Sequence, residues 1–273
     1  MNTSDPSPKL SQNDADSQRI SLIFDHSLTG WQNENLRGKL LRAGIAPASV
    51  NIHSLDCLPD RLDRTIVGFG ERTLRQLTDK KSVDKWALSP LRTGDGSLFI
   101  PTYDYPRVNK QYELNLYQEK ALLRAADMLR NPTPPFEERF RLNPQLEETY
   151  AILEMLEKTE EISVDVETGY GQINTVGFAW SPSDAIAINV LPDRCGDYAY
   201  YELWDRIRRV LEAPSRKVFQ NFIYDTSYFS AYGVRTQGEI FDTMWAMKFL
   251  WPELKSNLGN VGRFYTKRIY WKD

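Results

Sequence analysis

A proline-rich segment near the middle of the chain most constrains how this sequence can fold. Residues 131–144, NPTPPFEERFRLNP, contain four prolines. Because proline lacks a backbone N–H and clashes with the preceding turn of a helix, this segment cannot form a regular helix. We therefore predict a linker over residues 131–144 between two folded domains, residues 19–130 and 145–273. A chain of 273 residues is long enough for two domains, each with its own core.

Composition limits the classes of protein to which the chain can belong. Its net charge is −3, and no long run of Lys or Arg indicates a broad surface for nucleic acid. This charge argues against a role on DNA. It does not exclude one, because carboxylate sites that hold divalent cations carry local negative charge. The two cysteines, Cys57 and Cys195, give no spacing for a zinc site, an iron–sulfur cluster or a disulfide framework.

The ends of the chain and its apolar segments suggest where the protein resides. Residues 1–18 are polar and rich in Ser, Asp and Pro, so we expect a disordered lead-in. This segment lacks the apolar core of a signal peptide, and no apolar stretch is long enough to cross a bilayer. We expect a soluble protein of the cytoplasm, with no membrane partner.

Hydrophobic periodicity predicts alternating strands and helices in both domains, and hence an α/β fold. In the first domain we predict strands at 21–24, 50–55 and 65–70, and helices at 33–44, 70–78 and 111–130. In the second we predict strands at 161–167, 174–180, 184–190 and 217–220, and helices at 145–159, 201–213, 224–233, 241–251 and 255–265. Three early strands followed by alternating helix and strand suggest a mixed sheet.

The strand predicted at residues 161–167, EISVDVE, carries two acids. Ile162, Val164 and Val166 alternate with polar residues, so Asp165 and Glu167 leave the same face of the strand. Taken alone, such a pair is more often two exposed acids on the open face of a half-buried strand, and D-x-E alone is a weak signal. A second segment, KVFQNFIYDTSYF, places Asn221 at a strand end and Asp225 at the start of a helix. There the helix dipole favours a carboxylate, which can also be a plain cap.

Together, D-V-E-T, N-F-I-Y-D-T-S-Y-F and F-D-T-M-W-A-M-K-F-L resemble the proofreading 3′–5′ exonuclease domain of phage-like family A DNA polymerases. That domain belongs to the DEDD exonucleases and has a ribonuclease-H-like fold. The resemblance implies that Asp165, Glu167 and Asp225 bind two divalent ions, Mg²⁺ or Mn²⁺, that act in phosphodiester hydrolysis. In this scheme Asp165 bridges both ions, Glu167 holds the ion that activates water, and Asp225 supports the second ion.

The resemblance also suggests roles for residues around the acids. Thr168 and Tyr170 are expected to contact the 3′-terminal nucleotide of single-stranded DNA. Asn221 either contacts the substrate or fixes the local turn, and both alternatives stay open. Asp242 and Thr243 match a D-T pair that is usually structural in the family.

The fourth acid of the DEDD pattern is not found. In family A it is an Asp with a Tyr four residues before it, whereas Tyr270 and Asp273 are spaced one residue too closely. We expect that the chain is truncated before its last motif, or that a polymerase chain supplies it in trans. With three of the four ligands, we expect the second ion to bind poorly and the chain alone to have little activity.

The first domain resembles the uracil-DNA glycosylase superfamily through ENLRGKLLRAGI, RTIVGFGERTLRQLT and GSLFIPTYDYPRV. Where that family carries a catalytic histidine, this sequence has Asp104 and Tyr105. The only histidines, His26 and His53, are expected in a loop and at a strand end. The resemblance thus implies a degenerate glycosylase-like domain that serves as a scaffold, a DNA contact or a docking surface.

Our leading hypothesis is a 3′–5′ exonuclease that acts in DNA replication in a bacterial or phage-infected cell. The alternative is a catalytically incomplete module that binds DNA or docks on a polymerase. An RNA-trimming exonuclease of the same superfamily is a third hypothesis, which the glycosylase-like domain disfavours because uracil excision is DNA chemistry.

Overall fold

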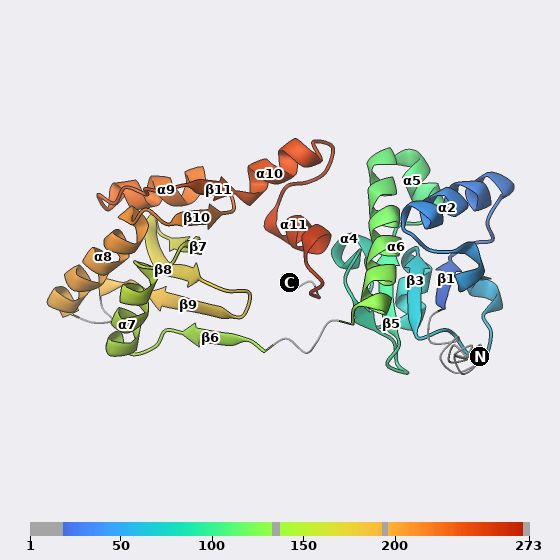
Figure 1. Cartoon of the computed structure of the whole chain (residues 1–273), viewed down its shortest axis with the longest axis horizontal. Coiled ribbons are helices and arrows are strands. Elements are labelled where there is room, and N and C mark those ends of the chain that lie inside the picture. Colours follow the sequence, from blue (N-terminus) through green and yellow to red (C-terminus); the bar gives the residue numbers. More distant parts are fainter. Residues whose placement is uncertain (1–18, 133–136, 193–195, 270–273) are drawn as a thin grey trace, which may run out of the picture. The chain divides into compact units, whose positions relative to one another are not determined.

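The computed structural model describes residues 19–132, 137–192 and 196–269. These residues divide into two units (Figure 1). The first unit holds the described residues up to 132 together with those from Gly262 onward, and the second holds residues 137 to Val261. The lead-in predicted over residues 1–18 lies outside the described residues.

A five-stranded sheet forms the centre of the first unit. Its strands are β1 (Ile20–Phe24), β2 (Val50–Ser54), β3 (Thr65–Phe69), β4 (Leu91–Arg92) and β5 (Leu98–Thr102). They lie in the order β2-β1-β3-β5-β4, and all neighbours are parallel except β4 and β5. Every residue of β1, β3 and β5 is buried, which is typical of parallel strands covered by helices.

The helices of the first unit alternate with its strands in the chain. They are α2 (Gly30–Arg42), α3 (Glu71–Leu77), α4 (Val83–Trp86), α5 (Tyr105–Lys110) and α6 (Asn115–Arg130), with 3₁₀ turns η1 (Pro47–Ser49), η2 (Leu55–Cys57) and η3 (Tyr112–Leu114). Helix α2 begins at a capping box in which the side chains of Thr29 and Gln32 each accept the other residue's backbone N–H. Helix α6 packs against β3, β5 and α2. The predicted α/β character of this unit is confirmed.

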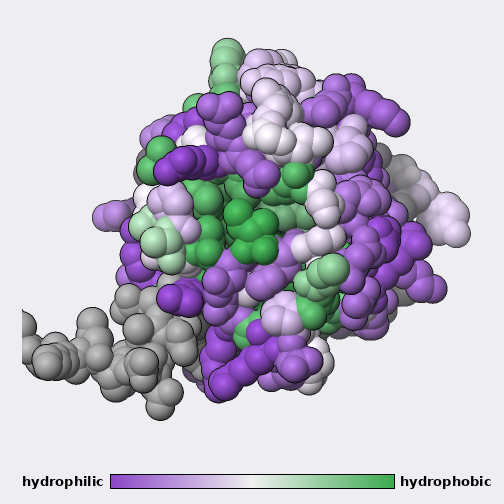
Figure 2. Space-filling view, turned by 90° about the vertical axis from the view of Figure 1, so that its right-hand side faces the viewer, coloured by the Kyte–Doolittle hydropathy of each residue, from purple (hydrophilic) through white to green (hydrophobic). Residues whose placement is uncertain are grey.

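Both polar and apolar side chains reach the surface of the first unit. Figure 2 looks onto this unit and shows hydrophobic residues near the middle of the face, with hydrophilic residues around them. Exposed apolar side chains of the unit include Trp31, Leu41 and Ile52. Across both units, none of the described helices combines the length and the apolar character that a membrane span requires.

A six-stranded mixed sheet forms the centre of the second unit. Its strands are β6 (Arg139–Leu142), β7 (Glu161–Gly169), β8 (Gln172–Ala179), β9 (Asp184–Asn189), β10 (Arg216–Phe219) and β11 (Ile240–Asp242). They lie in the order β11-β10-β7-β8-β9-β6. Strands β7, β8 and β9 pair antiparallel, whereas β10 pairs parallel with both β7 and β11, and β6 pairs parallel with β9. The predicted mixed sheet is confirmed.

The hairpin between β7 and β8 has a two-residue loop. Gly169 pairs with Gln172, and the loop residues Tyr170 and Gly171 have φ of 54° and 79°. Positive φ at both central positions is the pattern of a type I′ turn, which matches the twist of the two strands. The register of the pair shifts between Glu167 and Thr168, close to this turn.

Helices and the apolar face of the sheet enclose the core of the second unit. The helices are α7 (Leu146–Leu156), α8 (Gly196–Glu212), α9 (Phe222–Ala231), α10 (Thr243–Leu250) and α11 (Leu258–Tyr265), of which α11 ends in the first unit. The strand residues Ile162, Val164 and Val166 are buried in one hydrophobic cluster with Leu153 of α7 and Ile207 of α8. The alternation in β7 therefore fixes which of its residues face the core.

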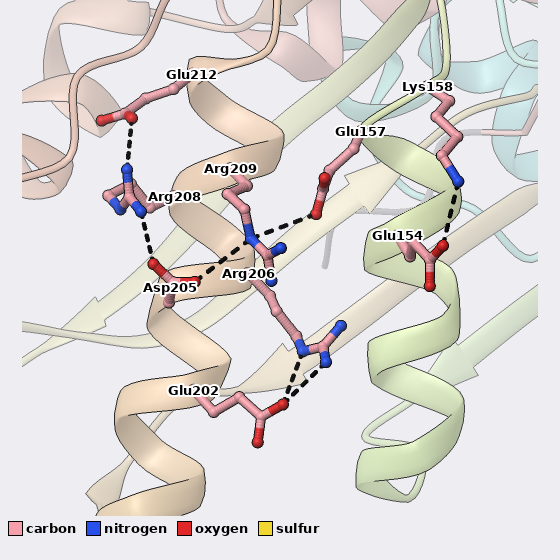
Figure 3. Close-up of polar contacts among 9 residues, drawn as sticks. All are labelled: Glu154, Glu157, Lys158, Glu202, Asp205, Arg206, Arg208, Arg209 and Glu212. Carbon is pink, nitrogen blue, oxygen red and sulfur yellow. Dashed lines mark hydrogen bonds and ion pairs between the residues drawn. The ribbon is translucent and has the colours of Figure 1, made fainter.

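Charged side chains connect the outer surfaces of α7 and α8 (Figure 3). Arg209 of α8 lies 3.7 Å from Glu157, just beyond α7, and 3.4 Å from Asp205 within α8. Arg206 and Arg208 make further pairs within α8, with Glu202 and with Asp205 and Glu212. Such exposed pairs contribute only about 0.3–0.5 kcal/mol each. These arginines are thus neutralised by neighbouring acids and do not form a basic surface.

The structure differs from the sequence predictions at the edges of the second sheet. Residues 139–142 form strand β6, so the predicted linker is wrong for this part of 131–144. Residues 240–242, taken in part as the start of a helix, form strand β11, and α10 begins at Thr243. Residues 262–269, which we assigned to the second domain, belong to the first unit. Strands β4 and β5 were not predicted.

Candidate active site

Strand β7 presents its two acids on the face opposite the core. Residues Ile162, Val164 and Val166 are buried, whereas Asp165 and Glu167 are exposed. Two residues apart on an extended strand, the two carboxylates leave the same side of the sheet. The prediction that both acids point to one face is therefore confirmed.

Asp225 lies in the first turn of α9 and its carboxylate reaches β7. The backbone N–H of Val166 donates to Asp225 Oδ1 at 3.2 Å, so the start of α9 lies against the strand between the two acids. Asp225 is only 2% exposed, in contrast to Asp165 and Glu167. The structure thus brings together Asp165 and Asp225, which are 60 positions apart in the sequence.

The electrostatics of this junction favour a cation. Burial, followed by the negative charge of Asp165, raises the pKa of Asp225 to about 7. A carboxylate that is both buried and close to a like charge is destabilised when ionised, unless a positive charge joins the site. Carboxylate oxygens are the ligands that hard divalent cations prefer. Asp165 and Asp225 therefore fit a divalent ion.

Few side chains that could bind a metal ion lie together at this junction. Within the ranges that the structure describes, no three Asp, Glu, His or Cys side chains lie together in an arrangement that could hold a metal ion. The predicted joint metal site of Asp165, Glu167 and Asp225 thus stays a prediction.

Asp242 fixes the turn from which α9 begins. Its carboxylate accepts the backbone N–H of Asn221 at 3.0 Å and of Phe222 at 2.9 Å. It also caps α10 by accepting N–H groups of Met244 and Trp245. Asp242 therefore connects two helix starts, which is a structural role.

The backbone conformation at Asn221 explains why an asparagine is suited to this position. Its φ of 70° and ψ of 57° lie in the left-handed region, which Asn tolerates better than most residues. Its side chain does not cap α9. The neighbouring Gln220 is held by Thr243, whose single hydroxyl proton lies within hydrogen-bond reach of both the Gln220 side-chain oxygen and the Phe219 carbonyl. These contacts explain the turn without deciding whether Asn221 also contacts a substrate.

Polar and aromatic side chains lie close in sequence to the acids on β7 and α9. The hydroxyls of Thr168 on β7 and Tyr224 on α9 lie 2.7 Å apart. The Tyr224 ring also contacts that of Tyr228, with ring centroids 5.1 Å apart. Tyr170 is fully exposed at the tip of the hairpin. Tyr224 was not among the predicted site residues, although its position directly before Asp225 on a predicted helix was a usable signal.

The first unit has a cavity of its own. It measures about 710 Å³ and lies near the carboxyl ends of β1, β3 and β5, where Asp25, Gly70 and Tyr103 line it. Asp25 Oδ2 and Oδ1 accept the backbone N–H groups of Arg72 and Thr73 at 3.0 and 2.7 Å. The Asp25 carboxylate thus satisfies the N-terminus of α3.

Asp104 and Tyr105, which the predicted glycosylase resemblance places at the position of its histidine, make contacts within the first unit. Asp104 caps α5 by accepting the Arg107 N–H at 3.1 Å. Tyr105 is buried, and its hydroxyl lies 3.2 Å from Asn35 Oδ1. The predicted loss of glycosylase chemistry stays a prediction.

Comparison with known families identifies a segment that contains most of the second unit and the first described residues after it. Residues 143–269 match the sequence model of a family described as 3′-5′ exonuclease. This part of the chain is a 3′–5′ exonuclease domain of the DEDD superfamily. The matched segment contains Asp165, Glu167 and Asp225. A search of curated proteins for similar sequences gives no match.

Several solved structures have weak similarity to the chain. The EXO domain of Nibbler from Aedes aegypti is 16% identical with a TM-score of 0.40, over 50% of this chain and 73% of that chain. RNase D from Escherichia coli is 13% identical with a TM-score of 0.32, over 39% and 28%. RNase D from Trypanosoma brucei, in complex with GMP, is 19% identical with a TM-score of 0.32, over 41% and 36%. The matches therefore span well under half of either RNase D chain.

Proposed function

We propose that the exonuclease domain removes nucleotides from the 3′ end of single-stranded DNA, as the proofreading part of a phage-like family A DNA polymerase. The observation that carries the proposal is the junction of α9 and β7. There the buried Asp225 carboxylate lies close enough to Asp165 for that charge to raise its pKa. Two carboxylates in mutual repulsion inside a 3′–5′ exonuclease domain are suited to share a cation.

Each of the three acids would have its own role in cation binding. Asp165 and Asp225 would hold divalent cations, Mg²⁺ or Mn²⁺, and Glu167 would add an oxygen ligand from the same face of β7. When bound, these ions stabilise the charge that develops on the attacking and leaving oxygens. Asp225 must be ionised to bind a cation, so its raised pKa makes weak binding below about pH 7 an expected property.

The open face next to the acids would hold the 3′-terminal nucleotide. The exposed ring of Tyr170 offers a stacking surface for a base, and such stacking does not require a particular sequence. Thr168, fixed by its contact with Tyr224, would position the terminal sugar or phosphate. Asn221 stays a candidate contact because it begins the helix that carries Asp225.

The wider setting is part of the same proposal and rests on the resemblance. We place the protein in DNA replication in the cytoplasm of a bacterial or phage-infected cell, with a polymerase chain as its partner. In this setting the first unit is a degenerate glycosylase-like domain.

A second candidate is a module that binds DNA or docks on a polymerase chain without cleaving. One observation favours it: the described residues do not assemble three metal-ligating side chains. The two candidates differ in whether a bound oligonucleotide is shortened when Mg²⁺ or Mn²⁺ is present.

The test is degradation of single-stranded DNA labelled at its 5′ end, with Mn²⁺, by the full chain. We expect a ladder that shortens from the 3′ end, and a loss of at least about a hundredfold in rate for the Asp165→Ala Glu167→Ala double variant. Glu161→Ala is the matched control, because Glu161 lies on the same face of β7 but pairs with Arg216. An RNA oligonucleotide of the same sequence tests the choice of DNA.

The outcomes separate the candidates. Wild-type degradation that the double variant retains would refute the assigned site. Binding of the labelled strand without degradation under either metal would favour the docking module. Faster degradation of the RNA strand would refute the choice of substrate while leaving the nuclease in place.

A further inference from the structure

Helix α10 of the second unit carries aromatic and cationic side chains on one exposed face. Trp245, Lys248 and Phe249 are spaced by three and four residues, so they lie along one stripe of the helix. We call these three residues the α10 stripe. All three are exposed, and Phe249 is 83% exposed. The ring centroids of Trp245 and Phe249 are 6.5 Å apart. Two large rings therefore lie next to each other at the surface.

Lys248 gives the stripe a positive charge. Its ammonium lies 4.7 Å from the centroid of the Trp245 ring, and α10 contains no acidic residue. Lysine is depleted in the centres of protein–protein interfaces, whereas surfaces for single-stranded nucleic acid combine aromatic rings with cations. There the rings stack on bases, and the cations attract the phosphates. The chemistry of the α10 stripe thus fits a single strand of nucleic acid better than a protein surface.

The stripe begins next to the turn that leads to Asp225. Asp242 Oδ1 accepts the backbone N–H of Asn221 at 3.0 Å and that of Met244 at 2.8 Å. Two nitrogens bonded to one oxygen at these distances are at most about 6 Å apart. Asn221 directly precedes α9, whose first turn holds Asp225, and Met244 directly precedes Trp245. A strand whose 3′ end lies at Asp225 is therefore close to the first ring of the stripe.

We propose that the α10 stripe binds the part of a single-stranded DNA that lies 5′ to the nucleotide being removed. Trp245 and Phe249 stack on bases, and Lys248 neutralises a phosphate. Helix α10 rises about 1.5 Å per residue, so Phe249 lies about 6 Å further along the helix than Trp245 and extends the binding surface away from the acids. The position relative to the 3′ end rests on the proposed function, whereas the binding of a single strand does not.

Fluorescence anisotropy of a 5′-labelled oligothymidylate of about twelve nucleotides tests the proposal with the full chain. EDTA in the buffer prevents metal-dependent hydrolysis, so binding is measured apart from cleavage. Phe249→Leu keeps an apolar side chain but removes the ring, and we expect its Kd to rise about tenfold because it loses the stacking of one base. Phe249→Tyr keeps the ring and should bind like the wild type. Tyr198→Leu is the matched control, because Tyr198 is also 83% exposed but lies on α8.

The salt dependence of the same binding tests the role of the charge. Lys248→Gln should reduce the slope of log Kd against log salt concentration by about 0.7, which is the contribution of one phosphate contact to a single strand. Phe249→Leu should leave this slope unchanged, because it removes no charge. Lys158→Gln is the control for the loss of a cation, since Lys158 is exposed and pairs with Glu154. Its slope should equal that of the wild type.

Several results would overturn the proposal. These are a wild type that does not bind the strand, a Phe249→Leu variant that binds as tightly as the wild type, and equal losses in Phe249→Leu and Tyr198→Leu. A wild-type dimer in sedimentation that the oligonucleotide does not dissociate would assign the stripe to a second copy of the chain instead. A wild type that binds the strand in EDTA but does not shorten it with Mn²⁺ would refute the proposed function and leave the binding surface in place.

Discussion

Replacing Asp225 by asparagine should make the metal-free protein more stable at mildly alkaline pH. Burial, and then the charge of Asp165, raise the pKa of this carboxyl from 3.8 to about 7. Between these two values the unfolded chain binds fewer protons than the folded one, so the wild type loses stability as the pH rises. Asparagine carries no charge and keeps a side-chain oxygen that can accept the Val166 N–H.

The size of the effect follows from the same pKa. A shift from 3.8 to about 7 corresponds to as much as about 4 kcal/mol of unfolding free energy above pH 7. Near pH 5 only about 1–2 kcal/mol of this cost is present, because most folded molecules keep the proton on Asp225. The advantage of Asp225→Asn over the wild type should therefore grow between about pH 5 and pH 8 and then level off.

Urea denaturation with EDTA at these two pH values measures the difference. Asp205→Asn is the control, since Asp205 is exposed and its pair with Arg208 lowers its pKa, so its neutralisation should give no gain. The reasoning is refuted if Asp225→Asn is no more stable than the wild type at about pH 8. It is also refuted if the gain is the same at both pH values.

Three further predictions concern residues with contrasting roles. Asp242→Ala should lower the unfolding free energy by about 3 kcal/mol in urea denaturation, because backbone N–H groups at two helix starts lose their acceptor. Gly70→Ala should cost more than about 2 kcal/mol in the same assay, since φ is 120° and a Cβ would lie 2.1 Å from the Asp25 carboxylate. Tyr224→Phe should raise the KM for a labelled DNA strand with kcat little changed, because it frees Thr168 and leaves the acids in place. A change in kcat alone would contradict this last prediction.

The sequence predicted the centre of the second sheet but not its edges. Strands β7, β8 and β9 show the alternation of a half-buried strand, which is a local property of the residues. Strand β6 follows a run of prolines and has mostly exposed residues, so its sequence lacks the alternation of a half-buried strand, and it forms through its pairing with β9. Strand β11 has three residues, none of them buried, and depends on β10 in the same way. Pairing across the chain is not visible in local periodicity.

The candidate site was predictable in its residue types but not in its electrostatics. Spacing alone placed Asp165 and Glu167 on one face and Asp225 at a helix start, and the structure agrees. The spacing of residues could not indicate that Asp225 is buried whereas Glu167 is exposed, because burial depends on how α9 lies against β7. Likewise, the two ends of α11 belong to different units because of contacts with α6, more than a hundred residues earlier in the chain.

Two aspartates near the start of α9 show how this turn can serve both folding and chemistry. Asp242 lies where backbone N–H groups converge, so its charge is well solvated by the protein and stabilises the turn. Asp225 is buried beside the negative charge of Asp165, and the N–H of Val166 offsets this only in part, so its ionisation destabilises the fold. A turn that Asp242 stabilises can tolerate the destabilisation caused by the ionised Asp225 carboxylate. A cation bound at Asp225 would remove that destabilisation. Asp242→Ala should therefore weaken Mn²⁺ binding as well as stability, although Asp242 is not a ligand in this scheme.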